Sequence, residues 1–240
     1  MPDPQHSHAA DPFSGAYGLS SALRQKSYER MHLQAGQCVL DVGCGTGAET
    51  LALAHQVGDG GSVHGVDYDG AMIAQAALRA RAENAADHVS YHHANATALP
   101  WPDNHFNASR SDRILQHMLD PEHGVDEQLR VTRHGGWVVV ISGDWSTLSI
   151  DSDEPDMDGR RAHFVASRVP DSPISGRCLR NLFARRGLLD IEIDVHPVFG
   201  AVMDSAQCWQ HSLEPVAAAA GLFASANVVM ISGRKPPVSA

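Results

Sequence analysis

The sequence predicts an α/β fold in which a mostly parallel sheet carries helices on both faces, in a single domain over residues 36–240. Three observations support this class. From residue 38 onward, short runs rich in β-branched residues alternate with helical stretches, which is the pattern of βαβ units. A glycine-rich segment follows the first of these strands. With 240 residues, 43% of them hydrophobic, the chain can bury a core without disulfide bonds.

The first half of the βαβ pattern contains three predicted strands and two predicted helices. In chain order they are CVLDV at 38–42, ETLALAHQV at 49–57, SVHGVD at 62–67, AMIAQAALRARAENAA at 71–86 and HVSYHHA at 88–94. The strands are short and apolar and the helices repeat apolar residues at helical spacing, so neighbouring strands are expected to run parallel.

A helix with clear boundary signals opens the second half. Asp120 is placed to cap it, Pro121 suits its first position, and Glu122 lies near the positive end of the helix dipole. The helix is expected to stop at residues 133–135, which contain Arg, His and Gly. The apolar run WVVVIS at 137–142 then predicts a fully buried strand.

Beyond residue 145 the pattern predicts an acidic loop followed by further helices and strands. The helices are expected near 160–169, 177–186 and 205–220, and the strands at 189–196 and 228–232. Two strands at the end of the chain would add an antiparallel hairpin to the sheet, although the pattern leaves their direction open.

Residues 1–35 are expected to form an N-terminal cap with a loose start and an amphipathic helix over 19–33. The insertion at 145–175 is expected to close over the site together with that helix, as a lid.

The charge balance argues against polyanionic partners. The chain has 18 Lys and Arg against 28 Asp and Glu, a net charge of -10, so neither nucleic acid nor a membrane surface is an expected partner. No apolar run reaches the length of a membrane span, and the polar opening does not resemble a secretion signal, so a cytoplasmic location is expected. The oligomeric state stays open.

The sequence contains no recognisable metal or disulfide pattern. The four cysteines, Cys38, Cys44, Cys178 and Cys208, lack the spacing of a zinc site or a disulfide framework and are expected to be reduced thiols. The acidic run at 151–158 resembles a calcium loop, but the position of its required bidentate glutamate holds Val165.

The segment VLDVGCGTGAET has the chemistry of a ligand-binding turn. A buried strand ends at Asp41 and leads into Gly43, Gly45 and Gly47, so the backbone can turn sharply and approach a ligand without Cβ atoms in the way. Twenty residues after Gly47 the next strand ends at Asp67, whose carboxylate can accept hydrogen bonds from ribose hydroxyls. The pattern therefore predicts a nucleoside-containing cofactor.

The same glycines also satisfy the dinucleotide pattern G-x-G-x-x-A, which ends at Ala48, so a nicotinamide oxidoreductase remains an alternative. Asp41 favours a nucleoside that carries an amino-acid group over a dinucleotide, because a carboxylate aimed at the turn would repel a pyrophosphate and attract an ammonium group.

From about residue 36 to about 145, with DVGCGTG as its glycine-rich motif, the sequence resembles the class I S-adenosylmethionine-dependent methyltransferases, closest to the small-molecule branch of quinone and natural-product enzymes. The resemblance implies a seven-stranded Rossmann-like sheet, S-adenosyl-L-methionine as cofactor and a small-molecule acceptor as substrate. It also implies these cofactor-binding residues: Asp41, Gly43, Cys44, Gly45, Gly47, Asp67, Tyr68, Met72, Asn95, Ala96, Thr97 and Ser111. The family usually has aspartate where this chain has Asn95, whose amide oxygen can accept the same adenine hydrogen bond.

Methyl transfer is an in-line displacement, so alignment of the reactants is the main requirement and a base is needed only for some acceptors. His117 is the first candidate base, because imidazole titrates near neutral pH, and Asp144 is the second. Asp112 and Arg113 are weaker candidates. Each residue has a structural alternative: His117 as a solvated side chain and Asp144 as an acceptor for backbone N–H groups.

Two further functional classes stay open at this point. The fold can use a bound cofactor without consuming it, in a cyclisation or rearrangement, or the chain can be a cofactor-binding module without turnover.

Overall fold

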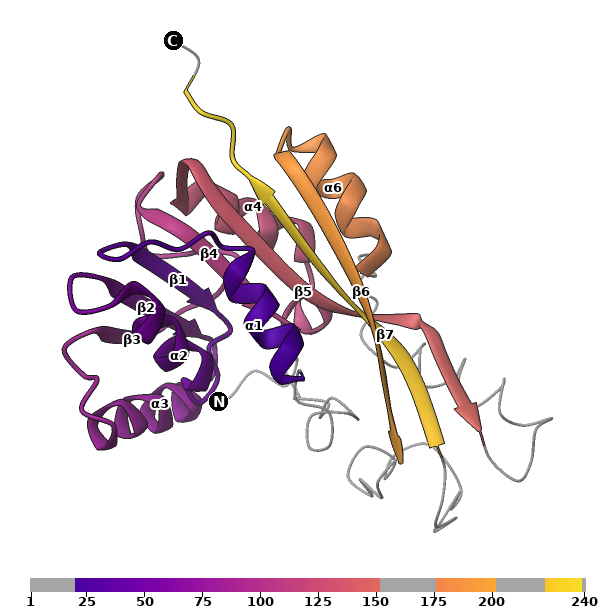
Figure 1. Cartoon of the computed structure of the whole chain (residues 1–240), viewed down its shortest axis with the longest axis horizontal. Helices are drawn as coiled ribbons and strands as arrows, with labels where there is room; N and C mark the ends of the chain where they lie inside the picture. Colours follow the sequence, from indigo (N-terminus) through magenta and orange to yellow (C-terminus); the bar gives the residue numbers. More distant parts are fainter. Residues whose placement is uncertain (1–19, 152–175, 202–222, 239–240) are drawn as a thin grey trace.

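The computed structural model describes residues 20–151, 176–201 and 223–238, and they form a seven-stranded sheet with helices on both faces (Figure 1). The order of the strands is β3-β2-β1-β4-β5-β7-β6. The strands are β1 (Cys38–Val42), β2 (Ser62–Asp67), β3 (Val89–His93), β4 (Phe106–Asp112), β5 (Thr132–Asp151), β6 (Leu189–Ala201) and β7 (Phe223–Arg234). The predicted α/β fold is therefore confirmed.

The first five strands are parallel and the last two are not. Strand β1 pairs in parallel with both β2 and β4, so the carboxyl ends of these strands meet at one edge of the sheet. Strand β7 inserts between β5 and β6 and runs antiparallel to each. The terminal hairpin is thus antiparallel, which settles the direction that the sequence left open.

Helices α1 (Ser21–Glu29), α2 (Ala48–Val57) and α3 (Gly70–Ala82) pack in one core cluster with alternate residues of the strands, among them Val39 and Val139. Helices α4 (Pro121–Val131) and α6 (Leu179–Arg185) pack against the other face, on Val138 and Val140. Neighbouring residues of one strand thus face opposite layers, as the period of two in a strand requires.

Local sequence signals set several of these boundaries. The side chain of Asp120 accepts a hydrogen bond from the backbone of His123, and Pro121 takes the first position of α4, as predicted. Helix α3 stops earlier than expected because Asn84 adopts a left-handed conformation just past its end. The predicted helix over 19–33 is present but shorter.

Strand β5 is much longer than predicted. The sequence pattern indicated a strand at 137–142 after a helix that stops at 133–135, but the strand begins at Thr132 and continues to Asp151. Its outer part pairs with β7 as far as Asp151 opposite Phe223, with an irregular register between Asp144 and Ser149 (Figure 1). The prediction was wrong because hydrogen bonding to a partner strand distant in sequence overrides the weak β-propensity of Gly, Asp and Ser.

Several predictions fall on residues outside the described ranges: the helices near 160–169 and 205–220, the segment before residue 20 and most of the 145–175 insertion. In the described part of the chain, Cys38 and Cys44 are free cysteines. No helix in the described ranges is both long and apolar enough to cross a membrane, and no cluster of metal-ligating side chains is found there.

Candidate functional site

The glycine turn between β1 and α2 has the backbone conformation that its sequence predicts. Gly43, Gly45 and Gly47 have φ values of +74°, +52° and +78°, a region that favours glycine. The backbone N–H groups of Gly43 and Cys44 donate to the carbonyl of Val66 on β2, at 2.7 and 3.0 Å. The turn is therefore held against the carboxyl end of the neighbouring strand.

The two glycines at the start of this turn differ in what surrounds them. A Cβ atom on Gly43 would lie 2.0 Å from the side chain of Ile114, so this position is closed by the protein itself. A Cβ atom on Gly45 would meet no atom of the described residues within 4 Å. The backbone of Gly45 thus borders open space, as a position that approaches a ligand requires.

Asp67 stands at the end of β2 beside that open position. One of its carboxylate oxygens accepts from the backbone N–H of Gly45 at 2.8 Å, and the other accepts from the backbone N–H of Asp69 at 2.9 Å. The carboxylate therefore links the glycine turn to the residues that follow β2. Since each carboxylate oxygen has more than one lone pair, acceptor capacity remains for a ligand hydroxyl.

Asp41, at the end of β1, is buried and only 1% exposed. One carboxylate oxygen accepts from the Thr50 hydroxyl at 2.7 Å, and the other lies 3.6 Å from Nη1 of Arg110. Burial raises the pKa of the Asp41 carboxyl to about 6, against the opposing effects of Arg110 and Thr50. The charge argument based on the sequence considered Asp41 alone, whereas the fold places the cation Arg110 beside it.

The predicted adenine-side residues lie around the carboxyl ends of β2 and β3. Tyr68 follows Asp67 and is half exposed, and Met72 lies in the first turn of α3. The Asn95 amide oxygen accepts two hydrogen bonds from Thr97, one from its backbone N–H and one from its hydroxyl, both at 2.9 Å. In this conformation, that oxygen shapes the turn that contains Ala96.

The residues expected on the substrate side come from β4, β5 and the short 3-10 helix η1 (Leu115–His117). Ser111 is buried on β4, and its hydroxyl has no hydrogen-bond partner within the described part of the chain. His117 ends η1 and is exposed. Asp144 is buried in the irregular part of β5, where the Ser146 hydroxyl donates to its carboxylate. It lies within β5, which continues to Asp151, whereas the sequence predicted a position at the carboxyl end of a central strand.

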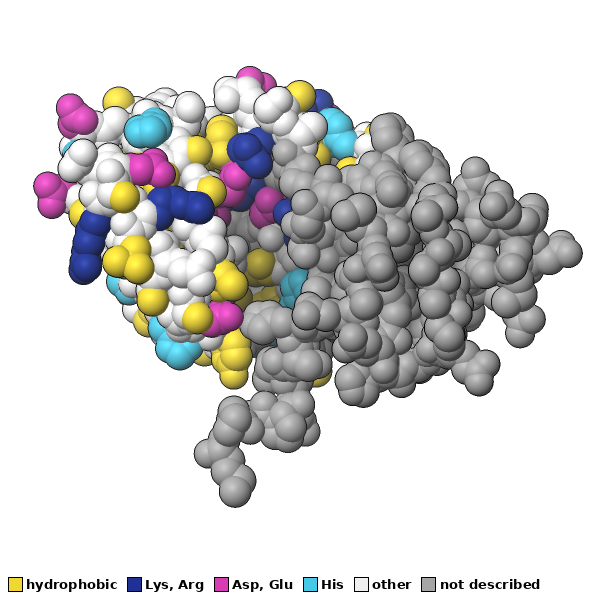
Figure 2. All heavy atoms as spheres, turned by 90° about the horizontal axis from the view of Figure 1, so that it is seen from below, with side chains coloured by type: hydrophobic (Ala, Val, Ile, Leu, Met, Phe, Trp, Pro, Cys, Tyr) yellow, Lys and Arg dark blue, Asp and Glu magenta, His cyan; other side chains and the backbone are white. Residues whose placement is uncertain are grey.

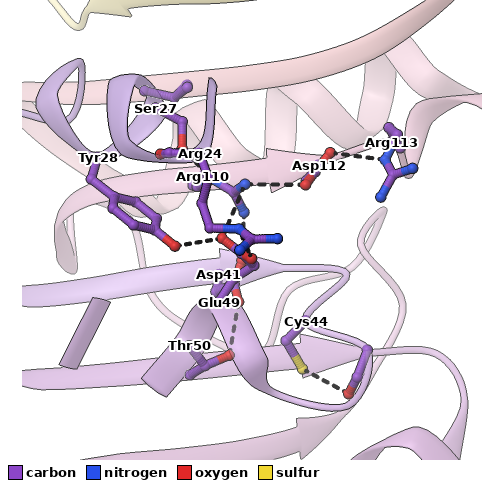
Figure 3. Close-up of polar contacts among 12 residues, drawn as sticks. Arg24, Ser27, Tyr28, Asp41, Cys44, Glu49, Thr50, Arg110, Asp112 and Arg113 are labelled. Atoms are coloured by element: carbon purple, nitrogen blue, oxygen red, sulfur yellow. Dashed lines mark hydrogen bonds and ion pairs between the residues drawn. The ribbon is translucent and has the colours of Figure 1, made fainter. Parts of the chain in front are cut away.

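Sequence reasoning missed the buried charge network that links this site to α1 (Figure 3). The Arg110 side chain on β4 is fully buried, and its guanidinium lies near the carboxylates of Asp41, Glu49 and Asp112. Glu49 also accepts from the Tyr28 hydroxyl at 2.6 Å. Side chains of opposite charge also meet in the middle of the described surface in Figure 2. The available signal was an arginine inside the otherwise uncharged start of a strand, FNASR.

Comparisons with family models and with curated proteins both find methyltransferases. Residues 40–140 match the family model described as a methyltransferase domain. A demethylmenaquinone methyltransferase from Anoxybacillus flavithermus is 36% identical over 127 residues, which is 53% of this chain and 53% of that protein. An uncharacterized 37.1 kDa protein in transposon TN4556 of Streptomyces fradiae is 35% identical over 171 residues, 68% of this chain and 48% of that protein. The chain spans about half the length of these curated relatives.

Among solved structures, a geranyl diphosphate C-methyltransferase from Streptomyces coelicolor, in complex with S-adenosyl-L-homocysteine, superposes with a TM-score of 0.63. The match covers 98% of this chain and 86% of that one at 19% identity. This likeness shows that the two chains share a fold.

Proposed function

We propose that this chain, which belongs to the class I S-adenosylmethionine-dependent methyltransferases of the small-molecule type, transfers a methyl group to a small organic acceptor. One observation carries the proposal: the open glycine turn between two acids, Asp41 and Asp67, at the carboxyl edge of the parallel sheet. Ligands of open α/β sheets bind at this edge, outside the carboxyl ends of the strands.

The described residues fit an adenosyl cofactor. The position of Gly45 borders space that a side chain would fill, and the Asp67 carboxylate stands next to it as an acceptor for ribose hydroxyls. Tyr68, half exposed just after Asp67, is available to cover an aromatic base. These features support S-adenosyl-L-methionine as the cofactor.

In the proposed reaction, Asp67 and the glycine turn hold the cofactor, and His117 transfers a proton. Asp67 would hold the ribose hydroxyls of the cofactor, and the backbone of the glycine turn would hold its amino-acid part. When bound, S-adenosylmethionine supplies an electrophilic methyl group on its sulfonium. His117, exposed at the end of η1, is the proposed base that removes a proton from the acceptor.

A quinol-like aromatic is the first acceptor to test. Relatives named as demethylmenaquinone and ubiquinone/menaquinone biosynthesis methyltransferases support this class. The net charge of -10 also disfavours polyanionic acceptors. The proposed reaction is therefore methylation of a small, partly apolar molecule.

Calorimetry followed by a transfer assay tests the proposal. We expect S-adenosylhomocysteine to bind the purified chain and NADH not to bind. With S-adenosylmethionine and reduced demethylmenaquinone, we expect a product heavier by one CH2. Binding of NADH without binding of S-adenosylhomocysteine would contradict the proposal.

Replacing Asp67 with alanine is expected to weaken S-adenosylhomocysteine binding by about 1 to 3 kcal/mol, because the ribose hydroxyls lose their acceptor. Calorimetry measures the effect, with Asp120→Ala as the control, since Asp120 caps α4 away from the turn. An affinity equal to that of the control would exclude Asp67 as a ribose ligand.

A further inference from the structure

We propose that Arg110 is a positioning residue that keeps Asp41 negatively charged beneath the amino-acid end of the bound cofactor and ties helix α1 to the glycine turn. The inference rests on the proposed function. The inference goes beyond the proposed function because it assigns a role to Arg110, which is fully buried and does not itself touch the ligand.

The register of the sheet brings the two residues together. Asp41 on β1 is directly paired with Arg110 on β4, so both side chains project from the same face of neighbouring parallel strands. Their charged groups lie 3.6 Å apart, and Asp41 is 1% exposed. A carboxylate with so little contact with water depends on a nearby cation to remain ionised.

The guanidinium of Arg110 is shared among several acids. Its Nη2 atom lies 3.1 Å from Asp112 and 3.6 Å from Glu49, while Nη1 faces Asp41 without a hydrogen bond within the described structure. Burial acts to lower the pKa of Arg110, but the carboxylates of Asp112, Asp41 and Glu49 outweigh it and raise that pKa. Arg110 therefore stays charged in the buried network.

The same guanidinium reaches α1. Its Nε donates to the Ser27 hydroxyl at 3.1 Å, and its central carbon lies 6.0 Å from the centre of the Tyr28 ring (Figure 3). Tyr28 in turn donates to Glu49, at the start of α2, as Arg24 pairs with the same carboxylate. One cation thus connects β1, α2, β4 and α1, the elements that surround the turn.

The pH dependence of binding reports on this role. Asp41 is faced by charged or titratable groups from every element around it. These are Arg110 and Asp112 on β4, Glu49 on α2, Cys44 in the turn, Tyr91 on β3 and, through Glu49, Tyr28 and Arg24 on α1. Burial raises the pKa of Asp41 to about 6, so its carboxylate form is complete above that pH and is lost as the pH falls through it. Without Arg110 the loss moves to higher pH.

Two ligands separate this role from a general structural one. S-Adenosylhomocysteine carries an amino-acid group with an ammonium, whereas 5′-methylthioadenosine has the nucleoside and the sulfur without it. Dissociation constants of both are measured by calorimetry from pH 6 to 9 for wild type, Arg110→Met and Arg110→Lys. Arg186→Gln is the matched control, because Arg186 also pairs with two acids, Glu122 and Asp126, but on the exposed surface of α6 and α4.

At pH 7, Arg110→Met is expected to weaken S-adenosylhomocysteine on the order of tenfold, the effect of moving the Asp41 midpoint from about 6 to about 8. Affinity should recover as the pH rises, Arg110→Lys should restore it, and methylthioadenosine binding should stay near that of wild type. If Arg110→Met weakens the binding of both ligands equally at every pH, the inference is overturned and the proposed function is unaffected. Binding of both ligands equal to that of wild type has the same consequence. A wild type that binds neither ligand would overturn both.

A second variant keeps the test decisive if Arg110→Met does not fold. Asp112→Asn removes a carboxylate near Arg110. In the wild type, that carboxylate competes with Asp41 for Arg110, and its negative charge raises the pKa of Asp41. The pH midpoint of S-adenosylhomocysteine binding should then move to lower pH. A midpoint equal to that of wild type would overturn the inference.

Discussion

Replacing Gly45 with valine is expected to reduce the affinity for S-adenosylhomocysteine by about 100-fold or more, because a branched side chain occupies space that the ligand needs. The described part of the protein leaves room for that side chain, since none of its atoms lies within 4 Å of the position of a Cβ on Gly45. The loss would therefore come from the ligand and not from a clash within the fold. Calorimetry measures the affinity, and thermal unfolding reports the cost of the substitution to stability.

Gly187→Val is the matched control for this experiment. Gly187, just past α6, also has a positive φ of +73°, and no atom of the described residues lies within 4 Å of its Cβ position. Both valines are strained in that backbone conformation, by about 1 to 2 kcal/mol. Equal destabilisation with binding lost only in Gly45→Val is the expected pattern. Retained affinity in Gly45→Val would show that the cofactor does not approach this turn.

Turnover is expected to fall by about 100-fold or more when His117 is replaced by alanine, because proton removal from the acceptor loses its base. Affinity for S-adenosylhomocysteine should change little, because the proposed role of His117 at the end of η1 is to take a proton from the acceptor and not to hold the cofactor. The measurement is methyl transfer to reduced demethylmenaquinone, together with calorimetry on the same preparations.

His55→Ala controls for loss of an exposed histidine, since His55 lies exposed near the end of α2. We expect its turnover to equal that of wild type. A near-normal rate in His117→Ala would instead leave alignment of the reactants as the source of catalysis and remove His117 from the mechanism.

The glycine turn is the part of the site that local sequence determines most completely. The strands at 38–42 and 62–67 have the predicted bounds. The three glycines adopt positive φ because the chain must reverse between a buried strand and a helix within a few residues. Such signals need only the residues near them, and so the helix that begins at Pro121 was equally predictable.

Strand β5 shows where local information is insufficient. Its outer part, GDWSTLSID at 143–151, interrupts the apolar run with Gly, Asp and Ser, and the sequence predicted a loop from residue 145. The hydrogen bonds of β7, which is distant in sequence, make it a strand and enclose Asp144 within it. The surroundings of this candidate base thus depend on a long-range pairing.

The sequence by itself determined the βαβ order, the glycine turn and the acids that follow β1 and β2, because strand periodicity, helix caps and left-handed glycines act over a few residues. Only the tertiary structure decided that Arg110 lies beside Asp41 and that Tyr28 and Ser27 close over that pair. The physical reason is that a buried charge is stabilised by groups brought near it in space, and the strand order β1-β4 and the docking of α1 bring them there.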